Sequence, residues 1–257
     1  MLSIAERHKY ILDKLNEYGF IRITGVAEEL GVTKVTIRND VKILESKGLL
    51  YKVHGSARLA NPHIADRDLT TKRLLNHEAK QCIANRAVEL IGEDDSIMIS
   101  AGSTTYALAE AIRENKSLRT LNVVTPFLKV SELLCDMEGV RVEQLGGRVH
   151  RKSCATFGES VEHILESVVC SKFFLGVDGV DPDFGITTST IEEAKLSHSM
   201  MAASSKTVIL ADSSKFGQRG FGHIASLEDV DIIITDDGVS KEMRDLIEEM
   251  GIELIIA

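Results

Sequence analysis

Short β-rich apolar runs alternate with segments of helical periodicity from about residue 78 to the end of the chain. Strands are expected at 97–99, 121–124, 140–145, 173–177, 208–211, 232–235 and 252–256. Helices are expected between them at 104–115, 127–135, 159–168, 191–204 and 240–250. Alternation of this kind is typical of domains in which helices connect parallel strands. The sequence therefore predicts a layered α/β fold with a mostly parallel sheet.

Charge is distributed unevenly along the 257 residues. The whole chain carries 30 Lys and Arg against 39 Asp and Glu, a net charge of −9, which by itself argues against a nucleic-acid partner. Residues 1–60, however, hold 10 Lys and Arg against 7 Asp and Glu, a net charge of +3, which leaves −12 for residues 61–257. We therefore expect a small basic domain at 1–60, a linker at 61–77 and an acidic α/β domain at 78–257.

The sequence indicates neither a membrane span nor a metal or disulfide site. No run approaches the roughly 18 consecutive apolar residues of a membrane span, and the N-terminus lacks the apolar block of a secretory signal. We expect a cytoplasmic protein. The four cysteines are widely spaced and the eight histidines are scattered, so we expect buried free thiols, no bound metal and no cofactor.

The first 60 residues contain the pattern of three short helices. Ser3 is the expected N-cap of a helix over 4–15, Thr24 of the second helix and Thr33 of the third. Gly31 supplies a tight turn between the second and third helices. The apolar stripe of the third helix consists of Ile37, Val41 and Leu44. Two short helices joined by a glycine-containing turn are the helix-turn-helix arrangement.

The outer face of the third helix is polar and basic. At 100° per residue, the arc opposite the apolar stripe carries Val35, Arg38, Asn39 and Lys42. Residues 49–53 and 57–59 follow and predict the β-hairpin of a winged helix. The residues expected to contact bases or phosphates are Thr33, Lys34, Val35, Thr36, Arg38, Asn39, Lys42, Lys52, His54 and Arg58. The alternative is a three-helix interaction module whose basic face is merely solvated.

Five motifs in this region resemble the DeoR-type helix-turn-helix. They are R-x-x-x-I-L at 7–12, V-A-E-E-L-G-V-T at 26–33, V-T-I-R-N-D-V at 35–41, L-E-x-x-G at 44–48 and H-G-x-A at 54–57. The T-I-R-x-D core followed by an H-G wing is a specific combination. The resemblance implies a winged helix-turn-helix that binds double-stranded DNA at an operator.

A loop rich in hydroxyl groups leaves the first expected strand of the α/β domain. Residues 100–105, Ser-Ala-Gly-Ser-Thr-Thr, open a helix, where backbone amides and hydroxyls can surround a phosphate. The loop is neither a Walker loop nor a dinucleotide-binding G-x-G-x-x-G. The alternative is that Ser103 or Thr104 is simply the N-cap of the helix.

Four further loops follow expected strands and carry polar or glycine residues. Asp178 and Asp212 can accept hydrogen bonds from sugar hydroxyls, and Arg148 and Lys215 can oppose an anion. This inventory suits a polyhydroxylated phosphate ester. Each feature alone is also compatible with an ordinary turn or a solvated charge.

In chain order, these loops resemble the DeoR-family C-terminal sensor domain. The motifs are G-S-T-T, the threonine ending a strand, L-G-G-R-V, G-V-D-G-V-D, G-I-T-T with a following E-E-A, and A-D-S-S-K-F-G. The resemblance implies a sugar-isomerase-like α/β fold that senses phosphorylated sugars. The implied effector-binding residues are Gly102, Ser103, Thr104, Thr105, Thr125, Gly147, Asp178, Gly179, Glu193, Asp212 and Lys215. The whole chain would then be a repressor of a carbohydrate operon and a homo-oligomer, either a dimer or a tetramer.

Two other functions stay open on the sequence. A sugar-phosphate isomerase could use Asp178, Glu193, Asp212 and Lys215 as acid or base groups, although it would have no use for a basic winged helix. A metal- or redox-sensing regulator could use the cysteines or the acidic loop at 178–183. Lone cysteines without partners at ligand spacing are, however, usually core residues, and an acidic loop of this kind usually forms turns.

Overall fold

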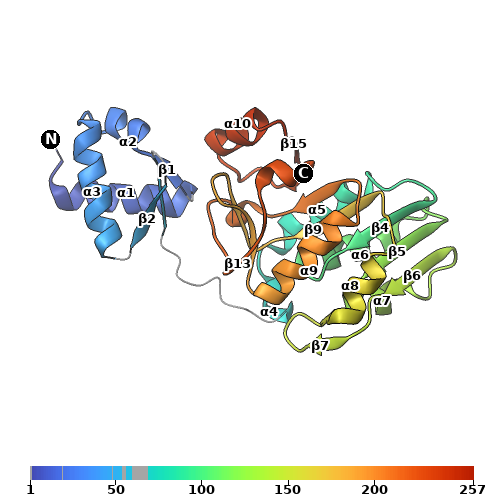
Figure 1. Ribbon diagram of the computed structural model, residues 1–257. Helices are drawn as coiled ribbons and strands as arrows, with labels where there is room; N and C mark the ends of the chain where they lie inside the picture. Colours follow the sequence, from blue (N-terminus) through green and yellow to red (C-terminus); the bar gives the residue numbers. More distant parts are fainter. Residues whose placement is uncertain (1, 19, 48, 54–55, 60–68) are drawn as a thin grey trace.

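The computed structural model describes residues 2–18, 20–47, 49–53, 56–59 and 69–257 (Figure 1). The predicted contact residue His54 and residues 61–68 of the predicted linker lie outside the described residues. No helix in the described part of the chain combines the length and apolar character needed to cross a bilayer. The N-terminal and C-terminal parts each have their own buried core.

The N-terminal part is a winged helix-turn-helix. Its elements are α1 (Ile4–Tyr18), β1 (Phe20–Arg22), α2 (Ile23–Glu29), α3 (Lys34–Ser46), β2 (Leu50–Val53) and β3 (Ser56–Leu59). The three strands form an antiparallel sheet in the order β1-β3-β2. The core contains the predicted stripe of α3, and Ile37 and Val41 are fully buried there against Ile11 and Leu15 of α1.

Two of the three predicted helix caps are correct. Ser3 caps α1 in a reciprocal arrangement, because its hydroxyl accepts from the Glu6 amide at 3.3 Å and its own amide donates to the Glu6 carboxylate at 2.8 Å. The Thr33 hydroxyl accepts from the Thr36 amide at 3.1 Å. The prediction for Thr24 is wrong: α2 begins at Ile23, two residues earlier than a cap at Thr24 implies, directly after β1 and with no side-chain cap.

The C-terminal part is a three-layer α/β domain, which confirms the predicted fold class. Seven strands lie in the order β15-β14-β12-β9-β4-β5-β6, and every neighbouring pair is parallel. The strands are β4 (Asp95–Ile99), β5 (Leu121–Thr125), β6 (Val140–Gln144), β9 (Lys172–Gly176), β12 (Thr207–Leu210), β14 (Ile232–Thr235) and β15 (Glu253–Ile256). Continuous apolar runs such as β12 and β14 are buried on both faces, as parallel strands require.

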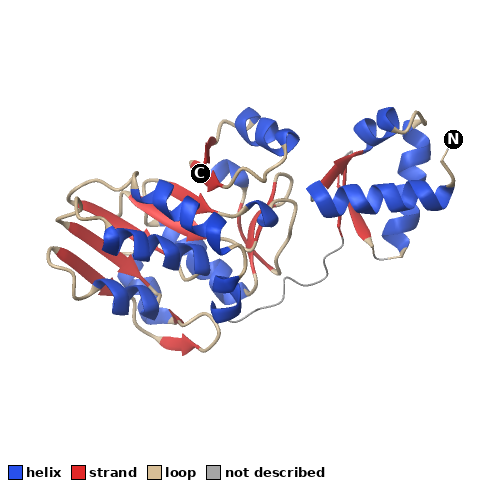
Figure 2. Cartoon of the chain, turned by 180° about the vertical axis from the view of Figure 1, so that it is seen from behind, coloured by secondary structure: helices blue, strands red, loops and turns tan. Residues whose placement is uncertain are grey.

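Helices cover both faces of this sheet (Figures 1 and 2). One face carries α5 (His77–Val88), α6 (Ser103–Glu114) and α7 (Leu128–Leu134); the other carries α8 (Glu159–Leu165), α9 (Ile191–Ala202) and α10 (Lys241–Glu249). Side chains alternate along each strand between the two cores. In β12, Ile209 packs against α9 and α10, whereas Val208 and Leu210 pack on the side of α5 and α6.

Several short elements surround the carboxyl edge of the sheet. They are α4 (Leu69–Leu74), β7 (Arg148–His150), β8 (Ala155–Phe157), β10 (Gly179–Asp181), β11 (Gly185–Thr188), the 3-10 turns η1 (Ser213–Lys215) and η2 (Leu227–Asp229), and β13 (Gly222–Ala225). β7 and β8 form a hairpin, and β10, β11 and β13 form a small antiparallel sheet. None of these strands was predicted, and α4 lies within the stretch predicted as a linker.

Candidate functional site

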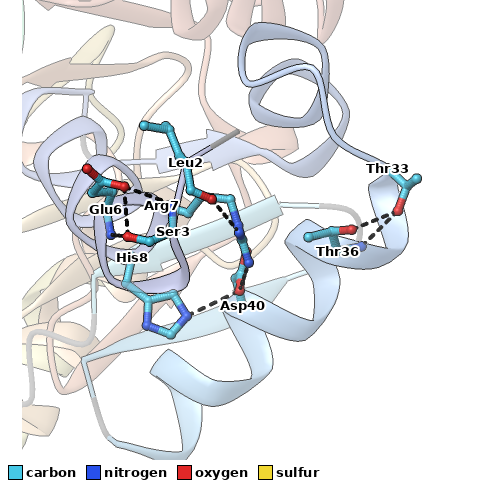
Figure 3. Close-up of polar contacts among 8 residues, drawn as sticks. All are labelled: Leu2, Ser3, Glu6, Arg7, His8, Thr33, Thr36 and Asp40. Carbon is cyan, nitrogen blue, oxygen red and sulfur yellow. Dashed lines mark hydrogen bonds and ion pairs between the residues drawn. The ribbon is translucent and has the colours of Figure 1, made fainter.

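Helix α3 is fixed in the N-terminal domain by a buried ion pair with α1. The Arg7 guanidinium donates two hydrogen bonds to the Asp40 carboxylate, at 2.7 and 3.1 Å, and a third to the Leu2 carbonyl at 3.0 Å (Figure 3). His8 Nε2 also lies 3.3 Å from Asp40 Oδ1, but without hydrogen-bond geometry. The aspartate of the T-I-R-x-D motif therefore orients the helix from its inner side and is not available to DNA.

The outer side of α3 presents the predicted reading residues to solvent. Val35 is 61 % exposed, and Arg38, Asn39 and Lys42 are exposed on the same arc. In the described part of the chain no side-chain hydrogen bond or ion pair engages Arg38, Asn39 or Lys42. Exposed basic and amide side chains on a helix that can enter the major groove suit base and phosphate contacts.

The remaining predicted contacts lie near this face. Thr33 and Lys34 are exposed and Thr36 is half-buried at the N-terminus of α3. Lys52 is exposed on β2, where its amide donates to the Glu45 carboxylate of α3 at 2.8 Å. Arg58 lies on β3, paired with Tyr51 in the hairpin. The hairpin is thus attached to the C-terminal half of α3, as a wing beside a reading helix requires.

A pocket opens at the carboxyl edge of the large sheet, where the strand order reverses. From β4 the chain continues outward through β5 and β6, whereas β9 begins the other half through β12, β14 and β15. The pocket holds roughly 570 Å³ of empty space, its open mouth included. Residues 101–104, which follow β4, and 176–178, at the end of β9, line it. A crevice at such a reversal is the usual ligand site of open α/β sheets.

The N-terminus of α6 faces this pocket without a cap. Gly102 occupies the N-cap position, and no side chain hydrogen-bonds to the first-turn amides. The alternative that Ser103 or Thr104 is the N-cap is therefore wrong. Both residues line the pocket instead, so their hydroxyls and the helix N-terminus can bind an anion.

The pocket contains three lysines and two carboxylates. They are Lys72, Lys152, Lys215, Asp178 and Glu193. Lys72 Nζ donates to both carboxylate oxygens of Asp178, at 2.8 and 3.0 Å. Glu193 accepts from the Thr188 hydroxyl at 3.0 Å and the Ser189 hydroxyl at 3.2 Å. One carboxylate of the pocket is thus paired with an ammonium group, and the other accepts hydrogen bonds from hydroxyl groups.

Asp178 is held in its charged form by this arrangement. The residue is only 6 % exposed. Burial by itself raises the pKa of Asp178, but the positive charges of Lys72 and Lys215 and the hydrogen bond from Lys72 together lower it below its usual value. A buried, charged carboxylate can accept hydrogen bonds from ligand hydroxyls.

Six of the predicted effector-binding residues line the pocket and five do not. The six are Gly102, Ser103, Thr104, Asp178, Glu193 and Lys215. Thr105 and Thr125 are fully buried, and their hydroxyls donate to main-chain oxygens at the end of β4: Thr105 to the Ser100 carbonyl at 2.8 Å and Thr125 to the Ile99 carbonyl at 2.7 Å. These two threonines hold the loops together behind the pocket wall.

The other three residues outside the lining also support the loops. A Cβ on Gly147 would lie 2.4 Å from the Phe157 carbonyl oxygen, and one on Gly179 would lie 2.3 Å from that of Gln218. These glycines allow main chains to approach closely. Asp212 is 1 % exposed and accepts from the Asn76 side chain at 2.8 Å.

One predicted anion partner is misplaced, and two lysines were missed. Arg148 is exposed on the β7 strand and pairs with Glu192 at 2.6 Å, away from the pocket lining. Lys72 comes from α4, inside the stretch predicted as a linker, and Lys152 from the β7–β8 turn. The only signal for either lysine in the sequence was its positive charge.

The groups considered for metal or redox sensing are dispersed or occupied. Within the ranges that the structure describes, no three His, Cys, Asp or Glu side chains gather as metal ligands. Asp181 receives two hydrogen bonds from Arg219, at 2.6 and 3.1 Å. The expectation of buried thiols holds for Cys170 alone, where burial raises the pKa to about 11; Cys82 and Cys135 are exposed.

The two halves define the class of transcriptional regulators that carry a DNA-binding helix and a ligand pocket in one chain. The DeoR-like helix-turn-helix domain matches residues 7–63, and the DeoR C terminal sensor domain matches residues 75–237. The chain therefore belongs to the DeoR family, as the motifs predicted.

Relatives along nearly the full length are named as regulators. The HTH-type transcriptional regulator GlpR of Haloferax volcanii is 31 % identical over 98 % of this chain and 97 % of its own length. The lactose phosphotransferase system repressor of Streptococcus mutans is 34 % identical over 90 % of this chain and 91 % of its own. The HTH-type transcriptional repressor GlcR of Bacillus subtilis is 28 % identical over 98 % and 95 %. The chain is a DNA-binding transcriptional regulator, and the isomerase alternative is set aside.

A partial likeness also exists to ribose 5-phosphate isomerase A from Methanocaldococcus jannaschii. It covers 55 % of each chain at 18 % identity, with a TM-score of 0.40. Such a likeness concerns the chain path alone and carries no conclusion about activity.

Proposed function

We propose that this regulator represses an operon for carbohydrate use and that a phosphorylated sugar in the pocket changes its affinity for the operator. Two of the relatives support this proposal by name, since one is a lactose phosphotransferase system repressor and another a transcriptional repressor. The observation that carries the proposal is that one pocket combines the uncapped N-terminus of α6 and lysine side chains with the carboxylates of Asp178 and Glu193.

The anion end would hold the phosphate. The uncapped N-terminus of α6 supplies backbone amides, Ser103 and Thr104 supply hydroxyls, and Lys215 supplies a positive charge. Asp178 and Glu193 lie in the same pocket, where their carboxylates would accept hydrogen bonds from sugar hydroxyls. A neutral sugar would leave the N-terminus of α6 without an anion, and inorganic phosphate would leave the carboxylates without hydroxyls.

The winged helix-turn-helix domains of two protomers would bind DNA as a pair. A homo-oligomer in the cytoplasm would place two copies of α3 at repeated half-sites, with the wings on the flanking phosphates. Effector binding would shift the population between arrangements that fit and do not fit the operator. No cofactor is required for either step.

A binding screen tests the proposal. The full chain is heated with glucose 6-phosphate, galactose 6-phosphate, fructose 1-phosphate, fructose 6-phosphate or glycerol 3-phosphate, and with the unphosphorylated compounds and inorganic phosphate as controls. A ligand at a hundredfold excess over its Kd adds about 2.7 kcal/mol to the free energy of unfolding. We expect a raised Tm with at least one phosphate ester and none with its unphosphorylated counterpart.

The same ester should then change operator affinity. Operator DNA is selected from a random pool with the full chain, and its Kd is measured by fluorescence anisotropy with and without the ester. Equal Tm values for phosphorylated and unphosphorylated compounds, or an operator Kd that no ester changes, would contradict the proposal.

A further inference from the structure

The segment that enters the sensor domain is held by polar contacts, one of which lies inside the pocket. This segment, residues 69–80, comprises α4, the corner after it and the first turn of α5. In the sequence it comes directly after residues 60–68, which follow the last strand of the winged helix. Lys72 and Asn76 bond to side chains elsewhere in the sensor domain, and Lys80 bonds back to the main chain of the segment. We call residues 69–80 the entry segment.

The first contact lies inside the pocket. Lys72 is the charged pocket residue carried by α4, and its ammonium group is the hydrogen-bond partner of Asp178. The Asp178 side chain is 8 % exposed and that of Lys72 is 23 % exposed, so the pair is largely shielded from solvent. Anything that binds Asp178 or Lys72 therefore acts directly on α4.

The other two contacts hold the corner between α4 and α5. The Asn76 side chain donates to Asp212 at 2.8 Å and to the Ser214 hydroxyl at 3.2 Å. The buried Lys80 ammonium donates to the Lys72 carbonyl at 3.0 Å and also to the Leu75 carbonyl. Because Lys80 binds the main chain of Lys72 itself, a displacement of α4 would also break a buried hydrogen bond of α5.

Helix α4 has six residues and packs on α6, with Leu69 half-buried against the core. Arg73 pairs with Glu110 of α6 at 3.1 Å and lies 4.0 Å from the centre of the Tyr106 ring, and the Leu69 amide donates to the Lys152 carbonyl at 3.1 Å. Leu74 at its end is 79 % exposed. A short helix with few apolar contacts moves at low cost, so its polar contacts determine where it lies.

We propose that an anionic effector takes Lys72 from Asp178 and that the resulting shift of α4 reports pocket occupancy to the winged helix. A phosphate group carries more negative charge than a carboxylate and offers three acceptor oxygens, so it competes well for an ammonium group at hydrogen-bond distance. Asp178, once released, accepts from the effector hydroxyls. The inference rests on the proposed function and adds the residue through which the pocket acts on the DNA-binding half.

Lys72 and Lys215 make a matched pair for the test. Both lysines line the pocket, but Lys215 lies on η1, outside the entry segment, whereas Lys72 lies on the entry segment. Lys72→Met and Lys215→Met each remove one charge from the pocket and leave a side chain of similar length. Lys129→Met, which breaks an exposed ion pair with Glu132 on α7, controls for the loss of a charge elsewhere.

The measurement is the operator Kd with a saturating phosphate ester divided by the operator Kd without it. The ester is one that raises the Tm in the binding screen. We expect both pocket variants to bind the ester roughly tenfold or more weakly than the wild type. At saturation Lys215→Met should keep the wild-type ratio, whereas Lys72→Met should bring the ratio to within twofold of one. Lys129→Met should match the wild type throughout.

A ligand-free measurement supports the same distinction. Hydrogen exchange of peptides spanning 69–80 should be faster in Lys72→Met than in the wild type, and unchanged in Lys129→Met. A wild-type ratio in saturated Lys72→Met would overturn the inference and leave the proposed function intact. If no ester changes the operator affinity of the wild type, the proposed function and the inference both fail.

Discussion

Replacing Arg38 with Ala tests whether the outer face of α3 reads bases. Arg38 is exposed on the arc that also carries Asn39 and Lys42, and the Arg7–Asp40 pair holds the opposite side of the helix. Because Arg38 points away from this pair and from the core, its truncation should leave the fold unchanged. Any change in DNA binding can then be assigned to the reading face.

The expected loss follows from the chemistry of the guanidinium group. A forked contact with a guanine is worth about 1–3 kcal/mol of discrimination, which is about 5- to 150-fold in Kd. The loss should appear against the selected operator and be much smaller against unrelated DNA. Lys42→Ala should instead weaken binding to both DNAs. It should also reduce the slope of log Kd against log salt concentration by about 1, as expected for a phosphate contact.

Fluorescence anisotropy over a range of salt concentrations distinguishes these outcomes. Lys9→Ala is the matched control, since it removes one positive charge from an exposed position on α1. If Arg38→Ala lowers affinity for operator and unrelated DNA equally, Arg38 contacts phosphate only. If it changes neither affinity, the reading face is misassigned.

Two further predictions concern the sensor domain. Burial raises the pKa of Asp95, but hydrogen bonds from Lys172 and its other neighbours outweigh this effect and lower the pKa below its usual value of 3.8. The charged carboxylate therefore stabilises the fold above the pKa of the unfolded state, and this stabilisation is lost as the pH falls through the pKa of the folded state. In urea titrations, Asp95→Asn should thus lower the free energy of unfolding by about 1–3 kcal/mol at pH 7, and by less below pH 4. A difference between the wild type and the variant that stays the same at low pH would contradict this role of the Asp95 charge. Gly179→Ala should lower Tm by several degrees, because the new methyl group would lie 2.3 Å from the Gln218 carbonyl oxygen and such overpacking costs about 1–3 kcal/mol. Gly146→Ala is the control, since a methyl group there has nothing within 4 Å. Equal Tm values for the two variants would refute the steric argument.

Much of the fold could be predicted because its signals are local. Each of the seven predicted strands of the large sheet corresponds to an observed strand with ends within two residues, since strands buried on both faces are continuous apolar runs. The α3 face was predictable because helical periodicity separates Ile37 from Arg38 without any tertiary information. Thr24 shows where local preference fails, because burial of Ile23 starts α2 before a capping residue is available.

The site was only partly predictable, because a polar loop residue can face either a ligand or another strand. Thr104 lines the pocket, but its neighbour Thr105 binds the end of β4, and nothing in the sequence distinguishes the two hydroxyls. Lys72 pairs with Asp178 across 106 positions, and a six-residue helix is too short to show a clear pattern.

The sequence by itself determined the strands of the large sheet, the helices between them, the basic reading face and the set of loops that carry polar groups. These features depend on neighbours within a few positions or on charge. The tertiary structure decided the order of the strands in the sheet, and through it which loops meet at the reversal between β4 and β9. It also decided that the entry segment reaches into the pocket, because a contact between residues far apart in sequence exists only after the sheet has assembled.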